Sequence, residues 1–331
     1  MRFPDPWSIL LVAVVAAWTS SAYGGTLRGP FGRSDAMRHE ARAHAFDLRH
    51  ITVDIDLTGE PGTIAGTARL ALGIVEPAVE SVVLDAVEME IAEARLARGV
   101  ALEHVCDGGR LKIELDRAYE VGESLEVVIE YTAQPRRGLY FITPDRDDPA
   151  RPMQVWSQGE PEETRYWIPI YDFPDDKATS ELFVTVPGAM TTISNGELVA
   201  TRPGPGDSTV FHWKQTIPHS TYLISLVAGS FDRYTETRSG VPLEYYVPPG
   251  TPKATVSRSF AATPDMLDFF ERTIGQSYPW ARYSQVAVQD FIFGGMENTS
   301  ATTLSADTLH PASSEPNFAS ESLVAHELAH Q

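Results

Sequence analysis

The chain has 331 residues, 43% hydrophobic and 21% charged, which is a globular composition with room for about two domains. Its formal net charge of −19 repels phosphate backbones and argues against nucleic acid as a partner, whereas a cationic ligand would be attracted. The same charge also serves solubility alone, so it does not by itself define a ligand.

The N-terminus has the pattern of an export signal. Arg2 precedes a short apolar run, Trp7–Trp18, and the small residues Ser20–Ala22 follow it. The run is too short to span a bilayer comfortably and is typical of a secretory signal. We expect residues 1–22 to be a signal peptide that makes the protein secreted, periplasmic or extracellular. An uncleaved anchor is the alternative, and only then is the membrane a partner.

The single cysteine, Cys106, excludes an internal disulfide. Without a cysteine cluster, a zinc site has to use histidine and carboxylate side chains. Free cysteines are among the more buried residue types, and we expect Cys106 to be buried or half-buried.

After a polar linker at 23–45, period-two alternation and short apolar runs indicate many β-strands. The clearest are at 51–57, 111–115, 125–131 and 182–186. Turn dipeptides such as Asn195-Gly196 separate them. Short strands at this spacing predict a β domain over residues 46–248, as an antiparallel sandwich or a large curved sheet.

The pattern changes near Pro248-Pro249-Gly250, where helical spacing begins. Thr251-Pro252 and Thr263-Pro264 predict two helix starts, each an N-cap followed by proline, and Gly275 predicts a helix end. A strand is predicted at 285–293, and a final helix begins near Ser320. We expect residues 249–331 to belong to a second domain.

The strongest functional pattern is the pentapeptide His-Glu-Leu-Ala-His at 326–330, within that final helix. Positions i and i+4 of a helix lie on one face, so His326 and His330 can both contact one metal ion. Zinc suits imidazole ligands, and Glu327 beside it can take a proton from the attacking water. The pattern predicts a zinc hydrolase with Glu327 as its catalytic base.

A second pattern lies upstream of the first. It is the run Gly294, Gly295, Met296, Glu297 and Asn298. Two glycines after an apolar strand allow a peptide backbone to approach and add as a further strand. Glu297 would then offer a carboxylate to the ammonium of a peptide's N-terminus. Because Gly-Gly alone is also common in plain turns, this assignment depends on the nearby metal motif.

Together the two motifs resemble those of the M1 family of gluzincin metallopeptidases, the aminopeptidase N family. That family carries Gly-x-Met-Glu-Asn, commonly with Ala where this chain has Gly295, and then His-Glu-x-x-His. The resemblance implies an α+β multidomain fold: an N-terminal antiparallel β saddle or sandwich, then the start of a thermolysin-like catalytic domain at 249–331. It implies a zinc-dependent aminopeptidase that acts on peptides with a free N-terminus and holds one Zn²⁺ through His326 and His330.

The resemblance extends to residues 157–174, which are similar to the family's substrate-flanking segment. It assigns substrate binding to Gln158 and Glu160, as it does to the Gly-Gly-Met-Glu-Asn run. A solvated acidic loop is the alternative for Glu160. A further landmark assigns Tyr222 and Leu223 to the scaffold, with both side chains in the core.

In the family, the third zinc ligand is a Glu on a later helix, which here would lie beyond Gln331. We therefore expect this chain to be a fragment that is inactive alone. Two alternatives stay open: a non-catalytic β-domain binding module, and an epoxide hydrolase-type relative on the same scaffold. A lost ligand or base would favour the first, but His326, Glu327 and His330 are all present.

Overall fold

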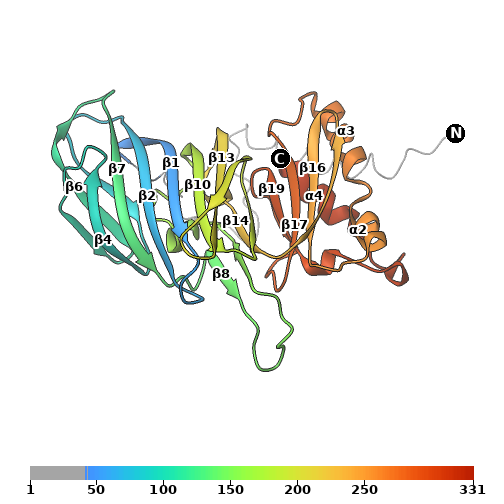
Figure 1. Ribbon diagram of the computed structural model, residues 1–331. Coiled ribbons are helices and arrows are strands. Elements are labelled where there is room, and N and C mark those ends of the chain that lie inside the picture. The colour runs from blue at the N-terminus through green and yellow to red at the C-terminus, as the bar shows by residue number, and fades with distance from the viewer. Residues whose placement is uncertain (1–41, 43) are drawn as a thin grey trace, which may run out of the picture. The chain divides into compact units, whose positions relative to one another are not determined.

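The computed structural model describes residue 42 and residues 44–331, so the predicted signal segment lies outside the described residues. The described chain is mainly β-sheet (Figure 1). Its largest sheet has seven strands in the order β12-β13-β10-β1-β2-β7-β4. These are β1 (Phe46–Asp56), β2 (Ile64–Ile74), β4 (Met89–Leu96), β7 (Ser124–Ala133), β10 (Lys177–Pro187), β12 (Glu197–Pro203) and β13 (Ser208–Ser220).

Strand β1 shows how the sequence pattern becomes a buried face. Phe46 and Leu48 are buried, and the buried set continues at Ile51 and Val53 after a register shift between Leu48 and His50. The extra residue of this β-bulge moves the apolar positions from even to odd numbers while they keep facing the core. Burial of such a side chain is worth roughly 1.5–3 kcal/mol, so the bulge preserves the strand's contribution to the core.

Two smaller sheets complete the N-terminal part, in the orders β3-β6-β5 and β11-β14-β9-β8. Their strands are β3 (Val79–Asp85), β5 (His104–Asp107), β6 (Arg110–Tyr119), β8 (Leu139–Ile142), β9 (Gln154–Ser157), β11 (Thr191–Ser194) and β14 (Leu226–Gly229). Their apolar side chains join those of the large sheet in one core. Strand pairs in these three sheets are antiparallel as predicted, apart from β1 with β10, which run parallel.

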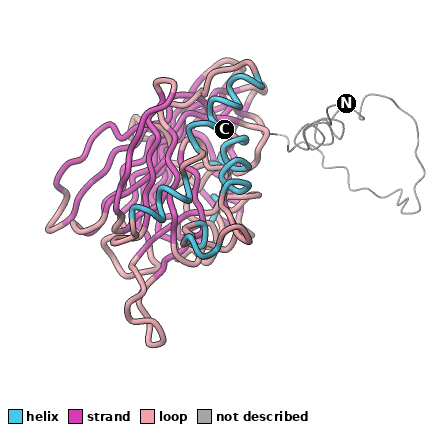
Figure 2. The backbone as a smooth tube through the Cα atoms, turned by 90° about the vertical axis from the view of Figure 1, so that its right-hand side faces the viewer, coloured by secondary structure: helices cyan, strands magenta, loops and turns pink. Residues whose placement is uncertain are grey.

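A fourth sheet, in the order β15-β16-β17-β19-β18, carries the helices on one side (Figures 1 and 2). Its strands are β15 (Asp232–Arg238), β16 (Val241–Val247), β17 (Tyr283–Val288), β18 (Gly295–Met296) and β19 (Ala301–Ser305). The helices are α2 (Lys253–Phe260), α3 (Thr263–Ile274) and α4 (Glu321–His330). Short 3₁₀ turns are at Thr164–Tyr166, Thr221–Leu223, Ala306–Thr308 and Ala312–Ser314. Because β16 pairs with β17, this sheet begins at residue 232, before the predicted division at 248.

The helix ends follow the prediction in part. Gly275 ends α3 in the left-handed conformation, at φ 75°, where glycine carries no steric penalty. The predicted N-caps are wrong by one residue or more, since α2 begins after Pro252 and Thr263 lies inside α3. The Thr263 hydroxyl accepts a hydrogen bond from Gln285 Nε2 at 3.0 Å, so it ties the helix to β17 and does not cap the helix.

Two other expectations were wrong. Cys106 is exposed, because it lies on β5, a short edge strand whose side chains mostly face solvent. The strand predicted at 285–293 ends at Val288, because Asp290 adopts a positive φ of 55° and turns the chain. No helix within the described residues is long and apolar enough to cross a membrane.

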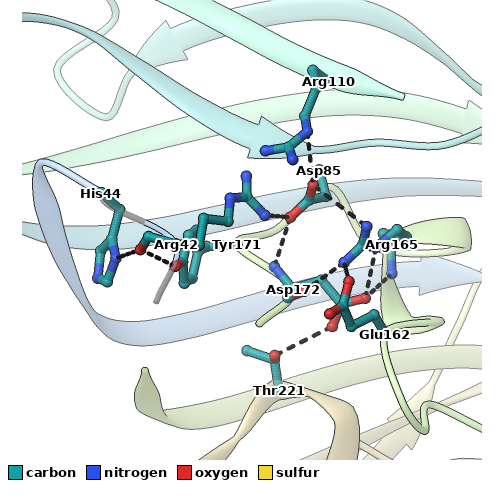
Figure 3. Close-up of polar contacts among 9 residues, drawn as sticks. All are labelled: Arg42, His44, Asp85, Arg110, Glu162, Arg165, Tyr171, Asp172 and Thr221. Carbon is teal, nitrogen blue, oxygen red and sulfur yellow. Dashed lines mark hydrogen bonds and ion pairs between the residues drawn. The ribbon is translucent and has the colours of Figure 1, made fainter. Parts of the chain in front are cut away.

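A buried ionic cluster joins β3 to the segment before β10 (Figure 3). The side chains of Asp85 and Asp172 are each 1% exposed, and Arg165 lies between them. Arg165 Nε is 3.2 Å from Asp172 Oδ2, and its Nη1 is 3.7 Å from Asp85 Oδ1. The Thr221 hydroxyl donates to Asp172 Oδ1 at 3.3 Å. The cluster thus fixes the chain that follows the predicted substrate residues Gln158 and Glu160.

Candidate active site

Helix α4 carries the predicted zinc motif on the face away from its packing contacts. Val324, Glu327 and Leu328 are buried, whereas His326 and His330 are exposed one turn apart. Ser320 stands at the N-cap position, but its hydroxyl donates to a carbonyl of α2 and makes no cap bond. This contact fixes the start of α4. The packing of its apolar face then holds the exposed face of the helix in position.

The two imidazoles fit a shared metal ion. Their Nε2 atoms are 3.2 Å apart, and the ring centroids are 4.8 Å apart. Two nitrogens bound tetrahedrally at ~2.0–2.1 Å from zinc lie ~3.3 Å from each other, so the spacing suits one ion. Within residues 42 and 44–331, no three His, Cys, Asp or Glu side chains converge as a metal site. The described chain therefore offers two of the ligands that a zinc site uses.

Glu327 is a buried carboxylate with an unused oxygen. It is 3% exposed, and its Oε2 has no hydrogen-bond partner within the described chain. Burial, together with the negative charges of Glu297 and Glu160, raises the pKa of Glu327 to about 7. Such a group is suited to accept a proton.

Gly295 gives Glu327 its room. A Cβ atom at position 295 would lie 2.4 Å from Glu327 Oε1, so any other residue would displace that carboxylate or the strand. The departure from the family's usual Ala therefore matches a close contact between β18 and α4. A glycine in a strand loosens it, and at this position it leaves the carboxylate of Glu297 in place. The contact shows that it also makes space for the carboxylate on the helix.

The second motif forms β18 and the turn after it. Met296 is buried and pairs with Thr303 of β19, and β18 is the last strand of its sheet. Glu297 is half-buried next to it, and Asn298 is buried with its Nδ2 donating to Thr303 Oγ1 at 3.2 Å. An edge strand with an adjacent carboxylate can bind an extended peptide by its backbone and its amine.

The N-terminal part supplies the residues predicted at 157–160. Gln158 is 1% exposed, and neither its Oε1 nor its Nε2 has a partner among the described residues. Glu160 is exposed, which is compatible both with substrate binding and with a solvated acidic loop. A Cβ atom at Gly159 would lie 2.2 Å from the carbonyl oxygen of Tyr222, so this loop passes close against that backbone. A buried amide without partners is costly unless a ligand satisfies it.

Two residues join the site that sequence reasoning did not assign to it. Tyr222, expected in the core, is half-buried and its hydroxyl donates to Glu297 Oε1 at 3.4 Å. Burial raises the pKa of Tyr222, as do the nearby carboxylates of Glu297 and Glu160. Gln331 donates to the carbonyl oxygens of Glu297 at 3.0 Å and Asn298 at 3.3 Å. For Gln331, the sequence signal that could have indicated a role in the site was its position directly after the metal motif.

Within the described residues, three carboxylates from separate segments thus lie close enough to interact electrostatically. They are Glu160 after β9, Glu297 after β18 and Glu327 on α4, and the first two both raise the pKa of the third. Like charges gathered in this way attract a cation. The arrangement is suited to a ligand that carries an ammonium group, next to the paired imidazoles of His326 and His330.

Two family models match the chain: the Peptidase M1 N-terminal domain over residues 45–223 and the Peptidase family M1 domain over residues 258–331. The chain belongs to the M1 peptidase family. This confirms the predicted resemblance. It also confirms the predicted α+β fold, a mostly β N-terminal domain followed by the start of an M1 catalytic domain.

Curated M1 relatives carry aminopeptidase names. Probable aminopeptidase 1 of Sulfurisphaera tokodaii is 27% identical over 262 residues, which are 76% of this chain and 31% of that protein. Glutamyl aminopeptidase of Rattus norvegicus is 31% identical over 59% of this chain and 21% of its own. Aminopeptidase N of Streptomyces lividans is 28% identical over 81% and 31%. The chain thus spans less than a third of each of these relatives.

Solved M1 structures share the fold. A mutant two-domain M1 zinc metallopeptidase bound to L-arginine has a TM-score of 0.71 at 23% identity, over 86% of this chain and 64% of that one. A mutant M1 zinc metallopeptidase from Deinococcus radiodurans bound to a Tyr-Ser-Ala substrate has a TM-score of 0.66 at 23% identity, over 80% and 62%. The M1 fold therefore accommodates both domains of this chain.

Proposed function

We propose that this chain is the amine-recognition and zinc-helix part of a zinc aminopeptidase that removes N-terminal residues from peptides. One observation carries the proposal: Glu327 has a buried oxygen without a partner in the described part of the chain, is flanked in the same helix by two closely spaced imidazoles, and has a pKa raised by the charges of Glu297 and Glu160. The aminopeptidase names of the relatives support it, as do the amino acid and peptide bound to the solved M1 structures.

Each residue has a chemical role in this proposal. Glu297 and Glu160 bind the α-ammonium of the substrate, and the Gln158 amide, which has no partner among the described residues, contacts its first residue. Glu327 accepts a proton from the attacking water and returns it to the leaving amine. His326 and His330 hold Zn²⁺, which when bound polarises the scissile carbonyl and lowers the pKa of water to about 7.

Strand β18 orients the substrate backbone. Gly295 and Met296 form the last strand of the sheet, directly after Gly294, so an extended peptide can add along this edge. Asn298 holds the turn after the strand through Thr303. A peptide bound in this way presents its N-terminus to Glu297, which follows the strand directly.

The zinc site needs a third protein ligand for catalysis. The alternatives of a non-catalytic binding module and an epoxide hydrolase-type relative have no specific support in the residues of the site.

The test uses the full gene product that contains residues 42–331, with aminoacyl-anilides whose amine is free or acetylated. We expect the free amine to react more than about 100-fold faster, because an acetyl group leaves the site's carboxylates unpaired. Zinc content should be close to one ion per chain and fall in H326A. Equal rates on both substrates, or hydrolysis that survives removal of zinc by a chelator, would contradict the proposal.

We also propose that the protein is exported, on the strength of the apolar run Trp7–Trp18 and the small residues that follow. N-terminal sequencing of the protein recovered from outside the cytoplasm should begin at or near Tyr23. A mature protein that still begins at Met1 and stays with the membrane fraction would instead support an uncleaved anchor.

A further inference from the structure

The turn Asn195-Gly196, between β11 and β12, lies against the site although the sequence marks it only as a turn. Asn195 is 2% exposed and uses its whole amide. Its Nδ2 donates to the Leu223 carbonyl at 2.9 Å and to the Thr299 carbonyl at 2.8 Å, and its Oδ1 accepts from Ser225 N at 2.7 Å. Two carbonyls and one N–H leave a single orientation for the amide.

The two carbonyls belong to two separate segments next to residues of the proposed ammonium site. Leu223 directly follows Tyr222, whose carbonyl covers the loop of Gly159 and Glu160. Thr299 lies two residues after Glu297. One side-chain nitrogen therefore bridges the segment that positions Glu160 to the segment that positions Glu297.

The turn that carries this amide is itself fixed. Gly196 has a φ of 70°, and a Cβ there would lie 1.9 Å from the Lys214 carbonyl oxygen, so glycine is required. Gly196 N donates to Ser300 Oγ at 2.7 Å, and the buried Arg282 Nε donates to the Gly196 carbonyl at 2.6 Å. Because these contacts hold the turn in place, the Asn195 amide keeps the two carbonyls that it binds at a fixed distance from each other.

We propose that Asn195 is a positioning residue. It sets the distance between the segment that carries Glu160 and the segment that carries Glu297, and thereby the affinity for a substrate's free amine. The proposal rests on the proposed aminopeptidase function. Asn195 touches neither substrate nor metal ligand, and it acts through the carbonyls of Leu223 and Thr299.

The test compares N195A and N195D with the control T192V in the full gene product. N195A removes all three hydrogen bonds. N195D keeps the acceptor for Ser225 N but turns an oxygen towards the two carbonyls. T192V removes one buried hydrogen bond of β11, the strand before the turn, from Trp213 Nε1 at 2.8 Å, and leaves the carbonyls of Leu223 and Thr299 untouched. N195S, which can bond only one carbonyl, replaces N195A if that variant does not fold.

We expect KM for a free-amine substrate to rise about tenfold in N195A and N195D, with kcat within about twofold and the preference over the acetylated substrate reduced. Hydrogen exchange should quicken in residues 222–226 and 297–301 of both variants and stay unchanged in T192V. A purely structural role through Ser225 would let N195D behave as wild type, which would overturn the proposal, as would an unchanged exchange pattern in N195A. A wild type without aminopeptidase activity overturns the proposed function first, before any variant is compared.

Discussion

Replacing Glu327 with glutamine is expected to lower kcat on the order of 10³-fold while zinc content stays unchanged. Glutamine has nearly the same shape but cannot take a proton from water, and positioned general bases contribute roughly 10²–10⁴-fold. Since Glu327 Oε2 has no protein partner within the described chain, the substitution breaks no hydrogen bond there. A loss of activity with an unchanged melting temperature would therefore report chemistry and not folding.

The matched control for this variant is E321Q, at an exposed acidic position in the first turn of the same helix. Both variants replace an acidic side chain of α4, but of the two only Glu327 lies against Gly295. We measure kcat, KM and bound zinc for each in the full gene product. If E327Q kept kcat within tenfold of wild type, or if E321Q lost as much, Glu327 would not be the base.

The sequence was sufficient for those parts of the site that depend on local spacing. The imidazoles of His326 and His330 face one another because a helix brings positions four apart to one side, whatever the rest of the fold does. Strand β1 was predictable from alternation, although its bulge at Leu48 was not. A bulge depends on the partner strand, and no local pattern records it.

The contacts between distant segments could not be predicted in the same way. Tyr222 meets Glu297 and Asn195 meets Thr299 only after two domains pack together, so neither residue has a spacing that reveals its role. The strands β15 and β16 look like the strands before them in sequence. Their membership in the fourth sheet is decided by the pairing of β16 with β17, across an intervening pair of helices.

The ionic cluster of Figure 3 carries the largest expected effect on stability: R165M should lower the free energy of unfolding by about 3–5 kcal/mol. The variant keeps much of the side chain's volume but leaves Asp85 and Asp172 buried without the guanidinium between them. The backbone N–H of Arg165 still donates to Asp172 at 3.1 Å, so the variant loses the guanidinium charge together with its side-chain hydrogen bonds to Glu162 and Asp172. The control is R69M, which breaks an exposed pair with Glu126, where we expect less than about 1 kcal/mol.

The pH dependence of this loss distinguishes charge from packing. Burial raises the pKa of Asp172 to about 6, and Arg165 is the main group that opposes the rise, so R165M should raise that pKa further. A carboxyl with a raised folded pKa contributes stability that is fully present below its unfolded pKa, 3.8, and is lost as pH rises through the folded value. Urea unfolding should therefore show a larger deficit of R165M at pH 8 than at pH 5. A deficit equal at both pH values would mean that Arg165 stabilises the segment after Glu160 through packing alone.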